Sequence, residues 1–162
     1  MDSRSETDRV EINNGLDSMP ANPWTFHVEV GADADALFLR LQDVLRAVAG
    51  ANSDSWPADE YWEGRLPGWM KVTLARLTQE QSDQLLKSTP RSDWDKLPWE
   101  FGSWIDAIRD RGWRWWGYQV NGSCANIVVH IAQYPERIDA FRQLLLAAGA
   151  VIKGESYSGL DR

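Results

Sequence analysis

Cysteine is almost absent from this chain, since Cys124 is the only one in 162 residues. One thiol forms no internal disulfide and supplies no cysteine-rich metal site, so we expect a cytoplasmic protein of a reducing compartment. No apolar run approaches the roughly 20 residues of a membrane-spanning helix, and the polar stretch 1–15 lacks the pattern of a signal peptide. The sequence therefore predicts neither a membrane partner nor a bound metal.

Catalytic and phosphate-binding signatures are missing as well. The chain contains no G-x-G-x-x-G or Walker pattern, and its serines stand in no nucleophile-elbow sequence. Basic charge is also scarce, because 17 Lys and Arg oppose 24 Asp and Glu for a net charge of −7. This acidity disfavours binding to nucleic-acid phosphates. We expect no cofactor, no nucleic-acid partner and, as the leading hypothesis, no catalysis.

What the chain does contain is the composition of one globular domain. Apolar residues make up 43% of it and charged residues 25%, which is enough to bury a core without disulfides. The acidity is uneven, because residues 1–22 carry five acids against two bases and show no apolar period. The sequence therefore predicts a disordered acidic tail over 1–22 and a single α+β domain over 23–162.

A strand followed by a helix is recognisable near the start of that domain, and a helix followed by a strand is recognisable near its end. Residues 24–30 alternate strictly between apolar and polar side chains, as a half-buried strand does, and 37–48 then carry an apolar stripe at helical spacing. Near the C-terminus, Pro135 opens a second helical stripe that Gly149 ends, and 151–156 fit a last strand.

A hairpin and a long insertion lie between these units. The stretch 113–132 alternates around Asn121-Gly122, the strongest two-residue turn signal, and predicts an antiparallel hairpin. When 51–111 are left out, the order strand, helix, strand, strand, helix, strand predicts a ferredoxin-like sandwich, an antiparallel sheet with helices on one face. Residues 51–111 are then a Trp-rich, partly helical insertion.

Tryptophan is over-represented, with ten residues in the chain. Large rings bury much area each, so the indoles can fill a core built from irregular segments. They can equally anchor a protein interface, where Trp is enriched. Acids lie among several of them, an arrangement that suits a basic protein partner. The predicted partner surface consists of Asp54, Trp56, Asp59, Glu60, Trp62, Glu63, Asp93, Trp94, Asp95, Trp113 and Trp115.

The predicted hairpin register also assigns side chains to the sheet face that carries no helices. With Val120 opposite Ser123, alternation sends polar and aromatic residues of three strands to this face. They are Trp113, Trp115, Asn126, Val128, His130, His27 and Glu29. This face suggests two alternatives, an enzyme that uses His27, His130 and Glu29, and a small-ligand sensor that uses the Trp-lined face as a pocket wall.

The leading interpretation is a non-catalytic protein-binding module. Its most concrete form is a bacterial immunity protein that neutralises a cognate toxin by binding it, with the basic partner as the toxin domain. A small, acidic, cysteine-poor chain without a catalytic signature suits the occlusion of a basic site. Thirteen arginines against four lysines agree with a GC-rich bacterial genome.

Overall fold

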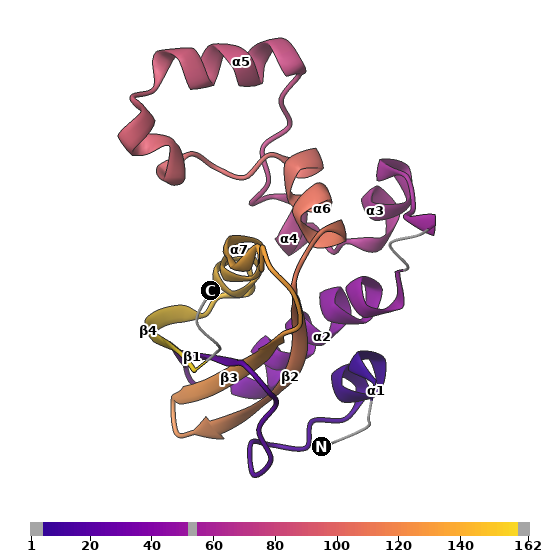
Figure 1. The fold of residues 1–162 in the computed structure, drawn as a ribbon, viewed down its shortest axis with the longest axis vertical. Helices are drawn as coiled ribbons and strands as arrows, with labels where there is room; N and C mark the ends of the chain where they lie inside the picture. Colours follow the sequence, from indigo (N-terminus) through magenta and orange to yellow (C-terminus); the bar gives the residue numbers. More distant parts are fainter. Residues whose placement is uncertain (1–4, 52–54, 159–162) are drawn as a thin grey trace.

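The computed structural model describes residues 5–51 and 55–158 of the chain (Figure 1). Within them the architecture is α+β, with seven α-helices and one four-stranded antiparallel sheet of strand order β2-β3-β1-β4. The strands are β1 (Pro23–Glu29), β2 (Trp113–Asn121), β3 (Cys124–Ile131) and β4 (Val151–Tyr157). Among the described helices, none combines the length and the apolar character that crossing a bilayer requires.

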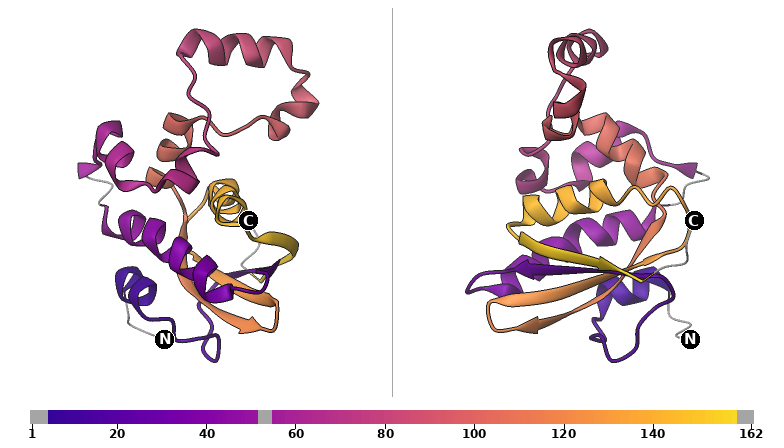
Figure 2. Two further views of the ribbon diagram at one scale, coloured as in Figure 1. Left: turned by 180° about the vertical axis from the view of Figure 1, so that it is seen from behind. Right: turned by 60° about the vertical axis from the view of Figure 1, so that its left-hand side comes forward.

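Two helices cover one face of the sheet, as the apolar stripes predict (Figure 2, right). In α2 (Ala34–Gly50), the Asp33 side chain caps the first turn by accepting a hydrogen bond from the Ala36 amide at 3.0 Å. The helix α7 (Ile138–Ala148) ends at Gly149, whose φ of 104° is the left-handed conformation that glycine adopts without strain. Both helices turn their apolar stripes towards the sheet.

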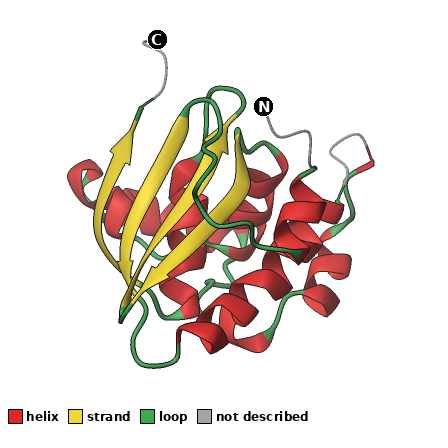
Figure 3. Ribbon diagram, turned by 90° about the horizontal axis from the view of Figure 1, so that it is seen from below, coloured by secondary structure: helices red, strands yellow, loops and turns green. Residues whose placement is uncertain are grey.

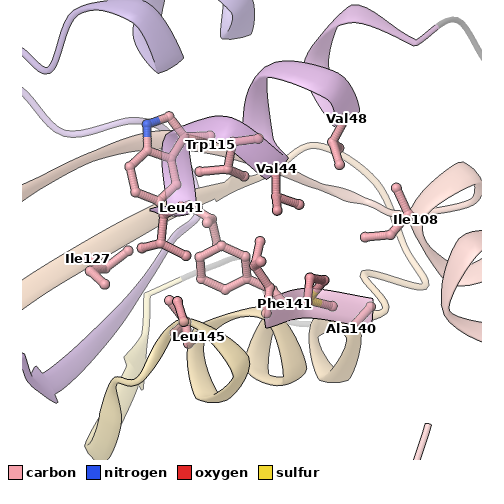
Figure 4. Close-up of a cluster of buried hydrophobic side chains, with 14 of the residues drawn as sticks. Leu41, Val44, Val48, Ile108, Trp115, Ile127, Ala140, Phe141 and Leu145 are labelled. Atoms are coloured by element: carbon pink, nitrogen blue, oxygen red, sulfur yellow. The ribbon is translucent and has the colours of Figure 1, made fainter. Parts of the chain in front are cut away.

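The core lies between these helices and the sheet, centred on Phe141 (Figure 4). The rings of Phe26 and Trp113 lie 5.2 Å and 4.8 Å from that of Phe141, centroid to centroid. A further helix, α6 (Phe101–Arg109), joins the same core, because the buried Trp104 donates from Nε1 to the Ala140 carbonyl at 3.1 Å. Part of the insertion therefore belongs to the core.

The predicted hairpin is confirmed, but its register differs from the prediction. Asn121 pairs with Cys124, so the two-residue turn is Gly122-Ser123, and Gly122 supplies the positive φ of 66°. A bulge then breaks the register between Trp115 and Gly117. An inserted residue reverses the alternation beyond it, so the two tryptophans that were expected on the open face point into the core instead.

Residues 5–22, which we call the N-terminal segment, fall in the stretch for which the sequence predicts a disordered tail, and they contact the body of the protein. This segment opens with α1 (Glu6–Glu11), whose Ser5 side chain accepts a hydrogen bond from the Asp8 amide at 3.2 Å. The chain then crosses the sheet face opposite α2 and α7 before entering β1 (Figure 3). This face is therefore partly covered.

The remainder of the insertion is helical and partly detached from the core. Two short helices, α3 (Asp59–Arg65) and α4 (Gly68–Lys71), lead into an excursion that we call the arm (residues 77–98). The arm carries α5 (Gln79–Ser88), which opens with the predicted capping box, and the 3-10 helix η2 (Arg91–Lys96). It extends away from the other elements (Figures 1 and 2).

Candidate functional site

The arm and the body enclose an apolar hollow, which we call the arm groove. Its volume is about 690 Å³. Backbone hydrogen bonds hold the base of the arm, where Ala75 donates to the Trp99 carbonyl at 2.7 Å and accepts from the Phe101 amide at 2.9 Å. Above this base, side chains of α5, η2, α7 and the residues flanking α5 and η2 form the walls, mainly Leu77, Leu85, Leu86, Trp94, Leu97 and Leu146.

Several of these apolar side chains remain open to solvent. No residue of α5 is buried, while Leu86 and Trp94 are each 38% exposed and Leu146 is 54% exposed. The Trp94 ring is held in place, because its Nε1 donates to the Thr89 carbonyl at 3.1 Å and the Arg91 guanidinium lies 5.1 Å from its centroid. Held apolar side chains around a hollow are the usual anchors of a protein interface.

An acidic hollow of about 480 Å³ adjoins the groove. Asp59, Glu60 and Glu63 reach it from α3, and Glu100 reaches it from the N-cap of α6. Gly102 lies beside two of these carboxylates, because a Cβ there would lie 3.2 Å from Glu100 Oε2 and 3.8 Å from Asp59 Oδ2. These two carboxylates are therefore near neighbours.

One arginine offsets part of this negative charge. Arg76 forms an ion pair with Glu63, and its guanidinium lies 3.9 Å from the centroid of the Phe101 ring. Asp59 and Glu60 lie in the first turn of α3, where carboxylates complement the helix dipole. Leu77 and Glu100 line both the acidic hollow and the arm groove, so the two hollows adjoin.

Most of the indoles assigned to the predicted partner surface lie inside the protein. Trp62 and Trp113 are fully buried and Trp115 is 4% exposed, so their placement on a partner surface is corrected. Trp56 is half-buried against Trp62, with ring centroids 5.0 Å apart. Trp94 is the exception among these indoles, because it lies at the surface in the arm groove.

The acids of the predicted surface are dispersed. Asp59, Glu60 and Glu63 line the acidic hollow, whereas Asp93 pairs at 3.2 Å with Lys96, a cation that lines the arm groove. Asp95 also belongs to η2. Asp54 lies outside the described residues. The structure therefore adds Glu100 to the acids of this surface, and it places Asp93 beside a cation.

The two histidines do not form a joint site on the open face. His27 pairs with Asn126 while His130 pairs with Pro23, so they stand four positions apart on the ladder, or about 13 Å. The Nδ1 atom of His27 donates to Asn126 Oδ1, and that of His130 donates to the Ala21 carbonyl, each at 2.6 Å. Among the described residues, no three potential metal ligands come together.

The sequence analysis missed the role of the N-terminal segment at the edge strand β2. Glu6 accepts two hydrogen bonds from Arg111, at 2.8 and 2.9 Å, and one from the Trp115 amide at 2.7 Å. Asn13 accepts from the Tyr118 amide at 3.0 Å and donates to its carbonyl at 2.9 Å. The signal was present, since Ser5 followed by acids is a helix start.

Comparison with known proteins adds no relative. No protein-family model, no curated protein and no solved structure matches this chain. Its function therefore has to be inferred from its own surfaces, and the arm groove with the acidic hollow places exposed apolar side chains beside carboxylates.

Proposed function

We propose that the chain is a non-catalytic protein-binding module, and that a basic protein binds at the arm groove and the acidic hollow. The observation that carries the proposal is that the two hollows adjoin and share Leu77 and Glu100 in their linings. A basic segment with apolar side chains would meet carboxylates and an apolar groove side by side. Interfaces of this kind combine anchoring rings with a charged rim.

The two parts of this surface would contribute differently to binding. The carboxylates of Asp59 and Glu60 are exposed and would mainly attract the partner during encounter. Trp94 is partly exposed and held by its own hydrogen bond, so a partner that covers it gains apolar burial at a low cost in side-chain entropy.

The most concrete form of this proposal is a bacterial immunity protein that occludes a basic site of its cognate toxin in the cytoplasm. The net charge of −7 and the single cysteine support it. We also propose the ferredoxin-like sandwich as the fold, because the strand order β2-β3-β1-β4 with two helices on one face agrees with it. The enzyme alternative loses support from the separation of His27 and His130.

Co-expression with the product of the adjacent reading frame tests the immunity hypothesis, with binding kinetics measured on the purified pair. Reversing Asp59 and Glu60 to Lys should slow association roughly tenfold and weaken its salt dependence. Trp94→Ala should instead speed dissociation and cost about 2 kcal/mol of binding free energy.

Matched controls come from exposed positions away from this surface. Asp43→Lys changes an exposed acid of α2, and Val72→Ala shortens a side chain that is 83% exposed. Neither should alter the kinetics. Absence of binding to the adjacent product would overturn the immunity hypothesis. Binding that is weakened neither by the reversal of Asp59 and Glu60 nor by Trp94→Ala would place the interface elsewhere.

A further inference from the structure

A separate hollow lies at the other end of the molecule, between α1, α2 and the edge strand β2. Its volume is about 360 Å³, within the range of small-molecule sites. Three rings line it, those of Phe38, Trp115 and Tyr118. Phe38 and Tyr118 stack face to face, with centroids 3.6 Å apart and planes 4° from parallel. The two rings therefore fix each other's orientation.

The N-terminal segment closes one side of this hollow and is hydrogen-bonded to both other walls. Asn13 joins it to β2 through the Tyr118 backbone, as described above. Gln42 joins it to α2, because its Nε2 atom donates to the Val10 carbonyl at 3.1 Å. The hollow is thus built by three elements of the chain and exists only while the N-terminal segment is docked.

Charged groups of both signs lie around the hollow. Glu11 and Asp35 contribute carboxylates, and Glu11 is paired with Arg46 at 2.6 Å. The guanidinium of Arg9 lies 3.3 Å from the centroid of the Trp116 ring, which is not part of the lining. Arg9 also lines the hollow, and this cation has a π partner of its own in the Trp116 ring.

Asp35 remains as the lining carboxylate that no ion pair within residues 5–51 and 55–158 engages. The negative charge of Asp35 also acts on the aromatic wall. Burial raises the pKa of the Tyr118 phenol, and the charge of Asp35 raises this pKa further. A cation at this point would meet a carboxylate and aromatic faces together, the combination that binds organic ammonium groups.

We propose that this hollow binds a small organic cation, a primary amine on an apolar body. The ammonium group would donate to Asp35 beside the Tyr118 ring, and the apolar body would lie against Phe38 and Trp115. This inference concerns a different surface from the arm groove and does not depend on the proposed function. It also assigns a role to the N-terminal segment, which would be stabilised by the ligand.

Three probes that differ mainly in charge test the proposal on the full chain: 2-phenylethylamine, the neutral 2-phenylethanol and the anionic 3-phenylpropionate. Calorimetric titration should detect the amine, with the alcohol and the acid at least about tenfold weaker, since a hydrogen bond to a charged group is lost. The amine should also raise the melting temperature in proportion to its occupancy. Failure of the amine to bind, or equal binding of all three probes, would overturn the proposal.

Two variants locate the binding. Asp35→Asn should weaken the amine at least about tenfold, whereas Asp43→Asn, an exposed acid of the same helix outside the lining, should leave it unchanged. Near-UV circular dichroism verifies that both variants are folded. Should Asp35→Asn bind the amine as tightly as the original chain, the amine binds elsewhere and the proposed site is wrong. Equal weakening by both substitutions would show that amine binding depends only on the net charge of the protein, and this result would also contradict the proposal.

Discussion

At the scale of single residues, tryptophan is a core residue at one position of the insertion and a surface residue at another. Trp62 and Trp94 both stand among acids in the insertion, and their neighbours in sequence look alike. Trp62 is nevertheless fully buried and packs against Tyr61, edge to face at 5.3 Å. Trp94 lies in the arm groove and is 38% exposed. Their contributions to stability should differ accordingly.

Trp62→Ala should lower the free energy of unfolding by about 3–5 kcal/mol, because truncation of a buried ring leaves a cavity. Trp94→Ala should lower it by less than about 1 kcal/mol, as surface substitutions usually do. Urea denaturation of the two variants measures both values. Equal losses would mean that the arm is as tightly packed as the core.

The ion pair of Glu6 with Arg111 is the second residue-scale determinant. The two side chains are only 14% and 9% exposed, so Glu6→Gln would leave the guanidinium largely buried without its counter-charge. We expect a loss of about 3 kcal/mol in the free energy of unfolding.

A matched control exists on the same helix. Glu11 pairs with Arg46, but these side chains are 44% and 50% exposed, so Glu11→Gln should cost much less stability than Glu6→Gln. Chemical denaturation at neutral pH compares the two variants. A Glu6→Gln variant as stable as Glu11→Gln would show that the N-terminal segment adds little to the stability of the domain.

At the scale of elements, the arm and the sheet differ in how they are held. The base of the arm is tied by backbone hydrogen bonds at Ala75, whereas α5 buries no side chain. By contrast, β4 is tied to α7, because Glu155 accepts two hydrogen bonds from Arg142, at 2.9 and 2.7 Å. The arm should therefore be separable from the fold, and β4 should not.

Replacing 78–97 by a short Gly-Ser linker should leave the body folded. Few buried contacts are lost, and shortening a loop changes its closure entropy only slightly. We expect a far-UV spectrum with less helix, an unchanged near-UV spectrum of the buried rings and a midpoint of urea denaturation close to that of the full chain. A chain that no longer unfolds cooperatively would show that the arm is part of the core.

The link between β4 and α7 predicts a pH dependence of stability. Hydrogen bonds from Arg142 lower the pKa of Glu155 below its usual value. A carboxyl with a lower pKa in the folded state stabilises the protein above its unfolded pKa, and this contribution is lost as the pH falls through the folded pKa.

Glu155→Gln should therefore be less stable than the original chain at neutral pH and should lose less stability on acidification. Urea denaturation between about pH 7 and about pH 3 measures this slope. Glu80→Gln serves as the control, because Glu80 is an exposed residue of α5 and should leave the slope unchanged. Parallel profiles for the original chain and Glu155→Gln would contradict the assignment.

At the scale of the whole molecule, a cohesive body carries one loosely attached projection. The strands β1 and β3 are central in the sheet and are hydrogen-bonded on both sides. The edge strand β2 is protected by side chains of the N-terminal segment. These side chains occupy backbone groups of β2 that could otherwise pair with a strand of another chain.

Native-state hydrogen exchange should reproduce this hierarchy. Amides of β1 and β3 should exchange only through global unfolding, and those of α5 through local opening at a much lower free energy. Amides of β2 should be slow while the N-terminal segment is docked, and Glu6→Gln should accelerate them more than those of β1. Uniform protection across the arm and the sheet would show that the arm is docked in solution.

The sequence by itself determined the elements whose signals are local. Alternation and helical stripes are properties of neighbouring residues, so β1, α2, the hairpin and α7 were predictable, as was the capping box at Thr78. The absence of catalytic and phosphate-binding signatures also depends on sequence alone. A protein-binding function was inferred from composition, and it stays a proposal.

The tertiary structure decided what depends on distant parts of the chain. A bulge of one residue at Trp116 reversed the faces of two tryptophans, which no local pattern of β2 indicates. The N-terminal segment lacks an apolar stripe and docks through Glu6 and Asn13, whose partners lie more than 100 residues away. Whether an indole lies in the core or in a groove depends on which surfaces meet it, so only the assembled fold separates Trp62 from Trp94.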